Sequence, residues 1–306
     1  MSTVTRRRFV QSLGVIALAP AVIRGRAAER ARLPIGFSTL GCPEWPLATI
    51  LDVASREGYA AIELRGLQGE MDLPKRPEFS TGVAATLADL RARDLKVACL
   101  GSSAQLSQRE PDERARQMDE ARRFIDLAAK LQAPYVRVFG DKYLPDEPKT
   151  ALVERVAAGM RELAAHAKGS GVEVIIESHG EVTDSATLKA ILTAAGTGTA
   201  LLWDAHHTVV ASKEAPADTY RELGTWVRHT HLKDSRPQGA DVRYVLTGDG
   251  TVPVREIVKV LAGAGYKGYY SFEWEKKWHP EIEDPEVAIP HYAKVMREYL
   301  REAGVQ

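Results

Sequence analysis

The sequence predicts an α/β protein in which eight strand and helix units close into a single (β/α)8 TIM barrel. From Pro34 onward, short β-rich segments alternate with longer segments of helical period, the pattern of a parallel sheet with crossover helices. Eight such units can be counted, and eight parallel strands are the number that closes. A length of 306 residues suits one barrel of about 250 residues preceded by a leader.

Strands are expected where β-branched and apolar residues run together between turn residues. They are placed at residues 35–39, 61–65, 97–101, 135–139, 173–177, 200–204, 227–231 and 269–273. Helices are expected at residues 47–57, 82–93, 111–131, 150–168, 185–194, 217–223, 254–264 and 288–303. Asp184 is a candidate N-cap of the fifth helix, and Gly58 and Gly265 follow helices at positions suited to left-handed C-caps.

The longest expected loops are residues 66–81, 141–149 and 233–251, and all three follow strands. In a barrel that end carries the active site. An open, doubly wound sheet shares the same alternation and is the structural alternative. The barrel is favoured because no Gly-x-Gly-x-x-Gly motif follows the first strand and polar residues gather at the ends of several strands.

Four apolar segments in the C-terminal half each end in a candidate metal ligand, namely Glu177, Asp204, His231 and Glu273. The intervals between them are 27, 27 and 42 residues, which suit one strand and helix unit twice and then a unit with an added loop. Side chains so far apart meet only where parallel strands end at one rim. The pattern therefore predicts a metal site at the carboxyl end of the barrel.

Three carboxylates and one imidazole form a mostly hard oxygen site. Such a site suits Mn²⁺ best, with Mg²⁺, Co²⁺ or Zn²⁺ as alternatives, and differs from a closed structural zinc site. Sulfur ligation is not expected. The only cysteines, Cys42 and Cys99, have no CxxC spacing; we assign them to the first and third strands as buried thiols rather than a disulfide.

The net charge and the N-terminal sequence limit the kinds of partner and the cellular location that we expect. The 41 Lys and Arg residues balance 41 Asp and Glu residues, so no global field would attract nucleic acid or an anionic membrane. Three arginines at positions 6–8 precede a moderately apolar segment at 13–23, which resembles a twin-arginine export signal and is too short to span a bilayer. We therefore expect residues 1–31 to be a leader, residues 32–306 to be the barrel domain, and the protein to be periplasmic or secreted without a stable membrane anchor. A basic tail without a targeting role is the alternative.

Residues two apart on a strand point to the same side. By this rule His179 and Lys233 lie beside Glu177 and His231 near the barrel mouth, where they could hold a sugar hydroxyl or orient a ligand. Trp278, in the aromatic segment after the last strand, is a candidate for stacking on a sugar face, with loop filling as the alternative.

Other polar and aromatic residues are expected to be structural. Glu63 and Arg65, on the second strand, should form an ion pair inside the barrel, and His206 should support the site without binding the ligand. Trp203 and Trp274 should point away from the ligands and pack against helices.

Four motifs, taken together, resemble the xylose isomerase-like barrel family of sugar phosphate isomerases and epimerases. The motifs are Ile-Glu177-Ser-His179-Gly, Trp-Asp204-Ala-His-His207, His-Thr-His231-Leu-Lys233-Asp and Phe-Glu273-Trp-Glu. The likeness runs over nearly all of residues 34–303. It implies a divalent metal held by Glu177, Asp204, His231 and Glu273, with both glutamates doubling as acid and base and His207 contacting the substrate.

Chemical reasoning agrees with that implication. Isomerising or epimerising a ketose requires removal of a proton α to a carbonyl, and a metal that chelates the carbonyl and the adjacent hydroxyl stabilises the enediolate. Two carboxylates facing the substrate can then exchange the proton. We expect an isomerase or epimerase of a free or oxidised sugar, ketose or cyclitol.

Several alternatives remain open. The same proton abstraction followed by loss of a leaving group would make the protein a lyase or dehydratase of a keto-sugar or keto-glycoside. An endonuclease-like phosphodiesterase is less favoured by the neutral charge, and a non-catalytic sugar-binding protein by the presence of both glutamates. The glycine-containing turn at 246–250 is only a weak phosphate signal, so a phosphorylated substrate is not required. A homo-oligomer is compatible with the sequence.

Overall fold

A closed parallel barrel lies at the centre of the protein. The computed structural model describes Met1 and residues 32–305. Its barrel strands are β1 (Leu33–Ser38), β2 (Tyr59–Leu64), β3 (Lys96–Gln105), β4 (Tyr135–Phe139), β5 (Glu173–Glu177), β6 (Thr199–Asp204), β7 (Val227–Leu232) and β10 (Tyr270–Phe272). Each strand pairs in parallel with the next, and β10 closes the ring by pairing with β1. The predicted TIM barrel is confirmed, and an open sheet is excluded.

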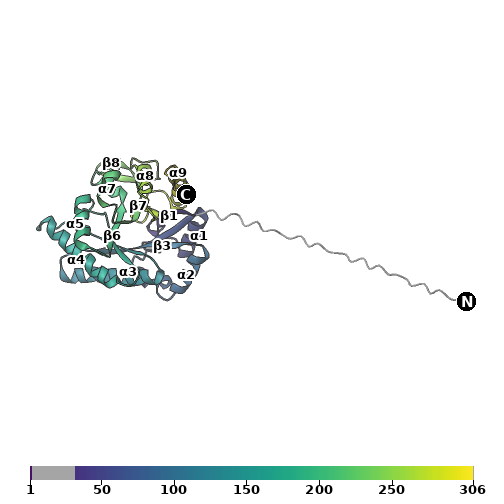
Figure 1. The fold of residues 1–306 in the computed structure, drawn as a ribbon, viewed down its shortest axis with the longest axis horizontal. Helices are drawn as coiled ribbons and strands as arrows, with labels where there is room; N and C mark the ends of the chain where they lie inside the picture. Colours follow the sequence, from purple (N-terminus) through teal and green to yellow (C-terminus); the bar gives the residue numbers. More distant parts are fainter. Residues whose placement is uncertain (2–31, 306) are drawn as a thin grey trace. The chain divides into compact units, whose positions relative to one another are not determined.

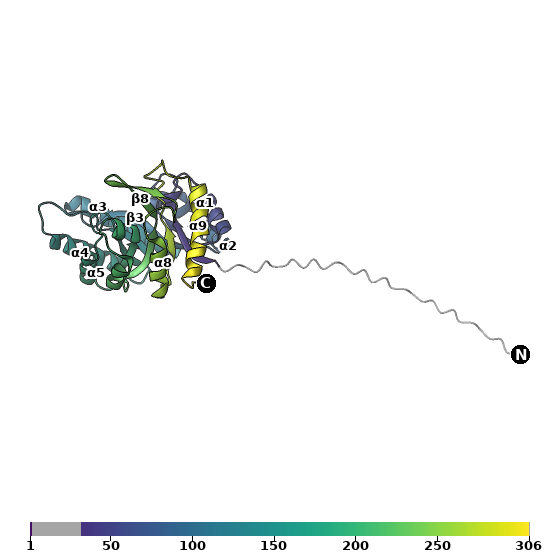
Figure 2. The same cartoon turned by 90° about the horizontal axis from the view of Figure 1, so that it is seen from above.

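Helices surround the strands, as Figure 1 shows for α2, α3, α4 and α5 around β3 and β6. The crossover helices are α1 (Leu47–Glu57), α2 (Val83–Ala92), α3 (Pro111–Leu131), α4 (Lys149–Ala167), α5 (Ser185–Ala195), α7 (Pro216–Leu223), α8 (Val254–Gly263) and α9 (Pro285–Glu302). Shorter helices occupy loops: α6 (Ala205–Val210), η1 (Thr39–Gly41), η2 (Leu73–Lys75) and η3 (Pro77–Phe79). In Figure 2 the C-terminal α9 lies near α1, and Arg297 on α9 donates a 2.6 Å hydrogen bond to the carbonyl of Glu57.

The helix ends follow the local signals. Asp184 caps α5 by accepting a 2.9 Å hydrogen bond from the backbone N–H of Thr187, and Gly58 ends α1 in the left-handed region at φ 83°. Helix α9 begins three residues earlier than predicted, at Pro285, because proline is well suited to the first helical position and Asp284 precedes it in extended conformation.

An antiparallel hairpin interrupts the loop expected at 233–251. Strands β8 (Asp234–Gln238) and β9 (Asp241–Val245) pair in register, and Gly239 turns between them at φ 62°. Glycine accepts this left-handed conformation without a steric penalty, so the turn can be short. The hairpin extends the barrel rim directly after β7, next to the predicted ligands.

Apolar residues fill two separate regions. The larger one lies between the strands and the helices, and a small one inside the barrel consists of Cys99, Ile175, Ala200 and Leu202. Cys99 is on β3 as predicted, whereas Cys42 follows η1 and not the first strand; both are buried free thiols. Because apolar groups close the lower barrel, polar inward-facing residues are confined to its carboxyl end.

The N-terminal predictions fall outside the described residues, since the leader corresponds to positions 1–31. Among the helices of the described part, none combines the length and apolar character needed to cross a bilayer.

Candidate metal centre

The structure brings the four predicted ligands together. Glu177, Asp204, His231 and Glu273 each place one donor atom within 4.8 Å of every other. Glu177 and Asp204 are the last residues of β5 and β6, His231 lies on β7, and Glu273 directly follows β10. All four are buried, with at most 4% of any one exposed. Parallel strand ends thus assemble the cluster, as their spacing in the sequence predicts.

The donor atoms fit a divalent cation. His231 Nδ1 lies 3.1 Å from Glu273 Oε2 and 3.3 Å from Glu177 Oε1, so this nitrogen faces the carboxylates. Asp204 uses Oδ1 to cap α6 at the backbone N–H of His207, 3.2 Å away, which leaves Oδ2 for the cluster. Glu177 Oε2 is buried 2.9 Å from Arg137 Nε without the geometry of a hydrogen bond, and Oε1 faces His231. Oxygen-rich donors with unused lone pairs suit a hard divalent ion.

Charge balance supports the same conclusion. The connected network contains five carboxylates, those of Glu63, Glu177, Asp204, Glu273 and Glu275. Its two permanent cations are Arg137 and Lys233. Buried carboxylates repel one another and resist ionisation unless cations compensate them. A bound dication would offset most of the surplus negative charge.

The pKa values reflect this imbalance. Burial raises the pKa of Glu177, but Arg137 and His231 outweigh it and lower the pKa to about 2. The pKa of Glu273 is lowered in the same way, against burial, by His231 and Lys233. For Asp204, burial dominates over Lys233 and the pKa rises. Glu177 and Glu273 are therefore ionised at neutral pH, as ligands must be.

Lys233 lies deeper than the sequence suggested. Its ammonium is 2.5 Å from Asp204 Oδ2 and 2.9 Å from Glu275 Oε1, and it also contacts Glu273. Burial would lower the pKa of Lys233, but the three carboxylates raise it well above its ordinary value. Lys233 is consequently a buried permanent cation of the cluster rather than a residue of the outer mouth.

A buried carboxylate that the sequence analysis assigned differently supports His231 from behind. Glu63 Oε2 accepts hydrogen bonds from Nε2 of His231 and Nε2 of His229, both at 2.8 Å. The expected ion pair between Glu63 and Arg65 is wrong, because Glu63 faces these histidines and Arg65 instead bonds Ser103. Against the effect of burial, Glu273, Glu63 and Glu177 raise the pKa of His231 well above its ordinary value, so the imidazole is protonated in the metal-free protein. A bound cation would displace the Nδ1 proton, and Glu63 would keep the other proton on Nε2.

Replacing Glu63 by Gln is expected to weaken Mn²⁺ binding by about 10- to 100-fold, because the imidazole of His231 loses the anion that orients it. The dissociation constant can be measured by competition with a chromophoric chelator. The matched control is E256Q, an exposed glutamate on α8. Equal affinity of E63Q and wild type, with unchanged circular dichroism, would contradict the orienting role.

Two further predicted residues form the rim of the cluster. His207 Nε2 is 3.3 Å from Asp204 Oδ2, and its ring meets that of His179 edge-on at 5.2 Å. His179 Nδ1 bonds Asp141 Oδ1 at 2.7 Å, with 37% of the His179 side chain exposed. Burial and Lys233 lower the pKa of His207, so it is neutral, whereas Asp141 raises the pKa of His179 against the effect of burial. Both imidazoles therefore lie at the edge of the four-residue cluster.

Two of the three tryptophans near the site lie where the sequence predicts. Trp203 and Trp274 are fully buried, and their indole N–H groups donate to Thr208 Oγ1 at 3.1 Å and to the carbonyl of Glu283 at 2.8 Å. Trp278 is 54% exposed and its ring lies near the Lys277 ammonium. The structure therefore does not join Trp278 to the buried cluster.

Arg137 is a site residue that the sequence analysis missed. It lies on β4, 1% exposed, with Nε 2.9 Å from Glu177 Oε2 and Nη1 donating to the carbonyl of Ser102 at 2.8 Å. Its guanidinium also stacks on Phe139, 3.8 Å from the ring centroid. The available signal was a lone arginine at an inward-facing position of an otherwise apolar strand.

The glycine-containing turn at 246–250 holds the protein's own carboxylate. Asp234 Oδ2 accepts hydrogen bonds from the backbone N–H groups of Gly248 at 2.9 Å and Gly250 at 3.0 Å, while Oδ1 accepts one from Val252 at 3.1 Å. A Cβ on residue 250 would lie 2.0 Å from Asp234 Oδ1, so glycine is required there. The turn fixes the base of the hairpin, and the weak phosphate signal has a structural explanation.

Comparison with known families identifies the architecture. The model of a family described as "Xylose isomerase-like TIM barrel" matches residues 51–299. The chain belongs to this family. The resemblance inferred from the four motifs is thus confirmed, and the four clustered ligands lie within the matched part of this xylose isomerase-like barrel.

Curated relatives of this xylose isomerase-like protein include inosose dehydratases. That of Serratia proteamaculans (strain 568) is 30% identical over 202 residues, which cover 59% of this chain and 64% of the relative, less than two thirds of its length. Inosose dehydratase 2 of Bacillus cereus (strain ZK / E33L) is 25% identical over 241 residues, or 70% of this chain and 78% of the relative.

Solved structures with the same fold include the IOLI protein with a bound zinc atom. It has a TM-score of 0.70 at 15% identity and covers 88% of this chain and 97% of its own. D-psicose 3-epimerase from Clostridium cellulolyticum H10 has a TM-score of 0.69 at 16% identity. The match covers 89% of this chain and 99% of the epimerase chain. At such low identity these likenesses show the shared fold.

Proposed function

We propose that the protein is a divalent-metal-dependent enzyme that removes a proton α to a carbonyl of a free or oxidised sugar, ketose or cyclitol, leading to isomerisation or epimerisation. The observation that carries the proposal is the convergence of Glu177, Asp204, His231 and Glu273 within 4.8 Å in a buried site. The zinc-bound IOLI structure, which shares the fold, supports a divalent metal. Mn²⁺ is our choice from the three-carboxylate donor set.

The residues have distinct roles in this proposal. A metal held by the cluster would polarise the substrate carbonyl and its neighbouring hydroxyl. Asp204 and His231 fix the geometry, and Glu63 orients His231. Glu177 and Glu273, both ionised at neutral pH, accept the proton from one carbon and return it. His207, which is neutral, and His179 at the rim bind substrate hydroxyl groups.

Dehydration is the second candidate, and the curated inosose dehydratases favour it. The same carboxylates would remove the α-proton, and loss of a β-hydroxyl would follow. Two carboxylates in one cluster support epimerisation, because proton exchange between two faces of a carbon needs a second base. The product mass separates the two reactions, since isomers keep the mass and dehydration removes one water.

The test is incubation of the Mn²⁺-loaded protein in D₂O with a panel of ketoses, 3-keto-glycosides and inososes. Deuterium at a single carbon of recovered material would support α-proton abstraction and identify the reacting position. A panel with neither deuterium incorporation nor loss of water would contradict the proposal. Export by the twin-arginine route, with a periplasmic or secreted location, stays a prediction that signal-peptide fusion to a reporter would test.

A further inference from the structure

Arg65 is a buried guanidinium with few partners. It directly follows β2 and is 7% exposed, yet among residues 32–305 no carboxylate oxygen lies within the 4.0 Å of an ion pair with it. Its side chain donates one hydrogen bond, from Nη1 to Ser103 Oγ at 3.0 Å. Burying a charge without an opposite charge is costly, so an anionic group of a ligand would lower the energy of this guanidinium.

The packing around Arg65 holds it in place beside the cluster. Gly101 on β3 separates Arg65 from Arg137, and a Cβ at Gly101 would lie 2.7 Å from Arg65 Cδ and 2.8 Å from Arg137 Nη2. The glycine therefore makes room for two guanidinium side chains in one layer of the barrel. Arg137 is neutralised by Glu177, 2.9 Å away, and Arg65 has no equivalent partner.

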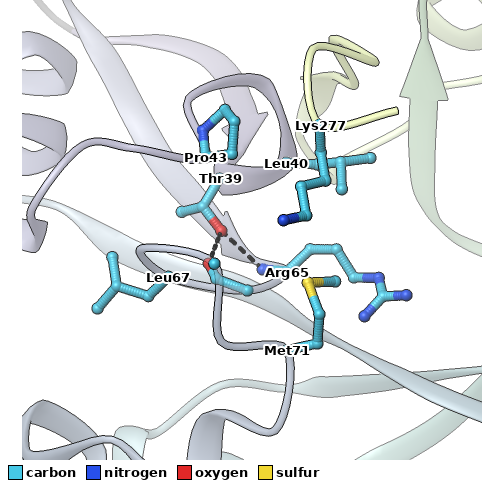
Figure 3. Close-up of a pocket in the computed structure, with 9 residues that line it drawn as sticks. Thr39, Leu40, Pro43, Arg65, Leu67, Met71 and Lys277 are labelled. Carbon is cyan, nitrogen blue, oxygen red and sulfur yellow. Dashed lines mark hydrogen bonds between the residues drawn. The ribbon is translucent and has the colours of Figure 1, made fainter. Parts of the chain in front are cut away.

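The unpaired side chain lines a small notch in the barrel mouth. Figure 3 shows Lys277 reaching toward the aliphatic part of Arg65, with Met71 beside Arg65; all three residues line the notch. The backbone N–H of Lys277 donates to the carbonyl of Leu40, 3.3 Å away, which ties its loop to the notch. Lys277 is half-buried and likewise has no carboxylate partner within 4.0 Å in the described range. Two cationic residues without a carboxylate partner in the described range thus line the same notch.

The notch lies within electrostatic reach of the metal centre. Burial and Arg137 lower the pKa of Arg65 to about 10, while the charges of Glu177, Glu273 and Glu120 oppose this effect. Arg65 therefore remains a cation at neutral pH. Glu120 is engaged elsewhere, accepting a 2.6 Å hydrogen bond from the backbone N–H of Ser103. Lys277 follows the ligand Glu273 by only four residues.

We propose that Arg65 and Lys277 form a subsite for the carboxylate of the substrate, which makes the substrate a sugar acid or a carboxylated cyclic polyol. This inference rests on the proposed function for the orientation of the rest of the substrate toward the metal. The notch has a volume of about 10 Å³, enough for one oxygen-sized group. A planar carboxylate with one oxygen in the notch fits that space better than a tetrahedral phosphate, and a guanidinium matches carboxylate geometry.

The experiment compares three ketoses that differ only at carbon 6. D-fructuronate carries a carboxylate there, D-fructose a hydroxymethyl group, and D-fructose 6-phosphate a phosphate. Dissociation constants are measured by calorimetry on the Mn²⁺-loaded wild type, R65Q, R65K, K277A and the exposed control R91Q. We expect wild type and R91Q to bind D-fructuronate roughly 10- to 100-fold more tightly than D-fructose, as for a charge-assisted hydrogen bond.

R65Q should lose most of this preference without a change in affinity for D-fructose, R65K should retain part of it, and K277A should lose less than R65Q. Equal binding of D-fructuronate and D-fructose by wild type would overturn the proposal, as would absence of binding by both. Tighter binding of the phosphate, or equal weakening of both sugars in R65Q, would also overturn it. Deuterium exchange on the same samples separates this failure from that of the proposed function, because exchange without a carboxylate preference refutes only the subsite.

Discussion

Substituting Gln for Glu177 or for Glu273 is expected to lower turnover by about 10²- to 10⁴-fold while the barrel stays folded. Each substitution keeps the size of the side chain and removes the anion that accepts the proton. Both carboxylates are held ionised by cations against burial, so a neutral amide cannot replace them. The measurement is the rate of deuterium incorporation, or of product formation, with the substrate found in D₂O.

Metal loss could produce the same defect, so bound Mn²⁺ per chain is measured alongside the rate. The matched control is E275Q, because Glu275 is a buried carboxylate of the same network that contacts Lys233 but lies outside the four-residue cluster. E275Q should retain more activity than either ligand variant. Near-normal turnover in fully metal-loaded E177Q or E273Q would refute its role as acid or base.

Replacing Lys233 by Met is expected to destabilise the metal-free protein by about 3–5 kcal/mol, the usual cost of removing one partner from a buried ion pair. Asp204, Glu273 and Glu275 would lose their shared cation, all at buried positions. Excess Mn²⁺ should restore much of the lost stability, because the dication supplies positive charge to two of the three carboxylates. The free energy of unfolding is obtained from urea titrations with and without the metal.

The control for this prediction is K294M, an exposed lysine on α9, which should change stability little in either condition. A K233M protein as stable as wild type without metal would show that the carboxylates are protonated or hydrated there instead of paired with Lys233. Equal destabilisation of K233M with and without Mn²⁺ would show that the charge of Lys233 is not coupled to metal binding.

Much of the fold and the core of the site could be predicted because their signals are local. The alternation of strands and helices can be recognised from the spacing of apolar residues within short segments of the sequence. Cap residues such as Asp184 and Gly58 mark helix ends through their own side-chain or backbone properties. Once eight parallel strands were counted, Glu177, Asp204 and His231 had to meet, because each stands at or near the end of a strand.

The supporting residues could not be found in the same way. Glu63 and His231 are 168 residues apart in the sequence. The inward-facing position of Glu63 on its strand was compatible with several hydrogen-bond partners. Pairing with Arg65 was the simplest choice by charge and proximity. Residues two apart on one strand stand in successive layers, however, and the missing side chain at Gly101 leaves room for Arg65 on the far side from Glu63's histidines. Similarly, Lys233 was predicted to face the mouth, and only the packed structure shows three carboxylates around it.

Because β10 pairs with β1 to close the barrel, the two halves of this protein depend on each other when they are expressed separately. A fragment that begins at β5 would contain every metal donor, from Glu177 to Glu273, but neither Glu63 nor Arg65. Its His231 would have no carboxylate behind it, and the edges of β5 and β10 would be exposed to pairing with other chains. Chelation by the separate C-terminal half should therefore be poor, and adding back the N-terminal half as a second polypeptide should recover it only if the two pieces rejoin the ring.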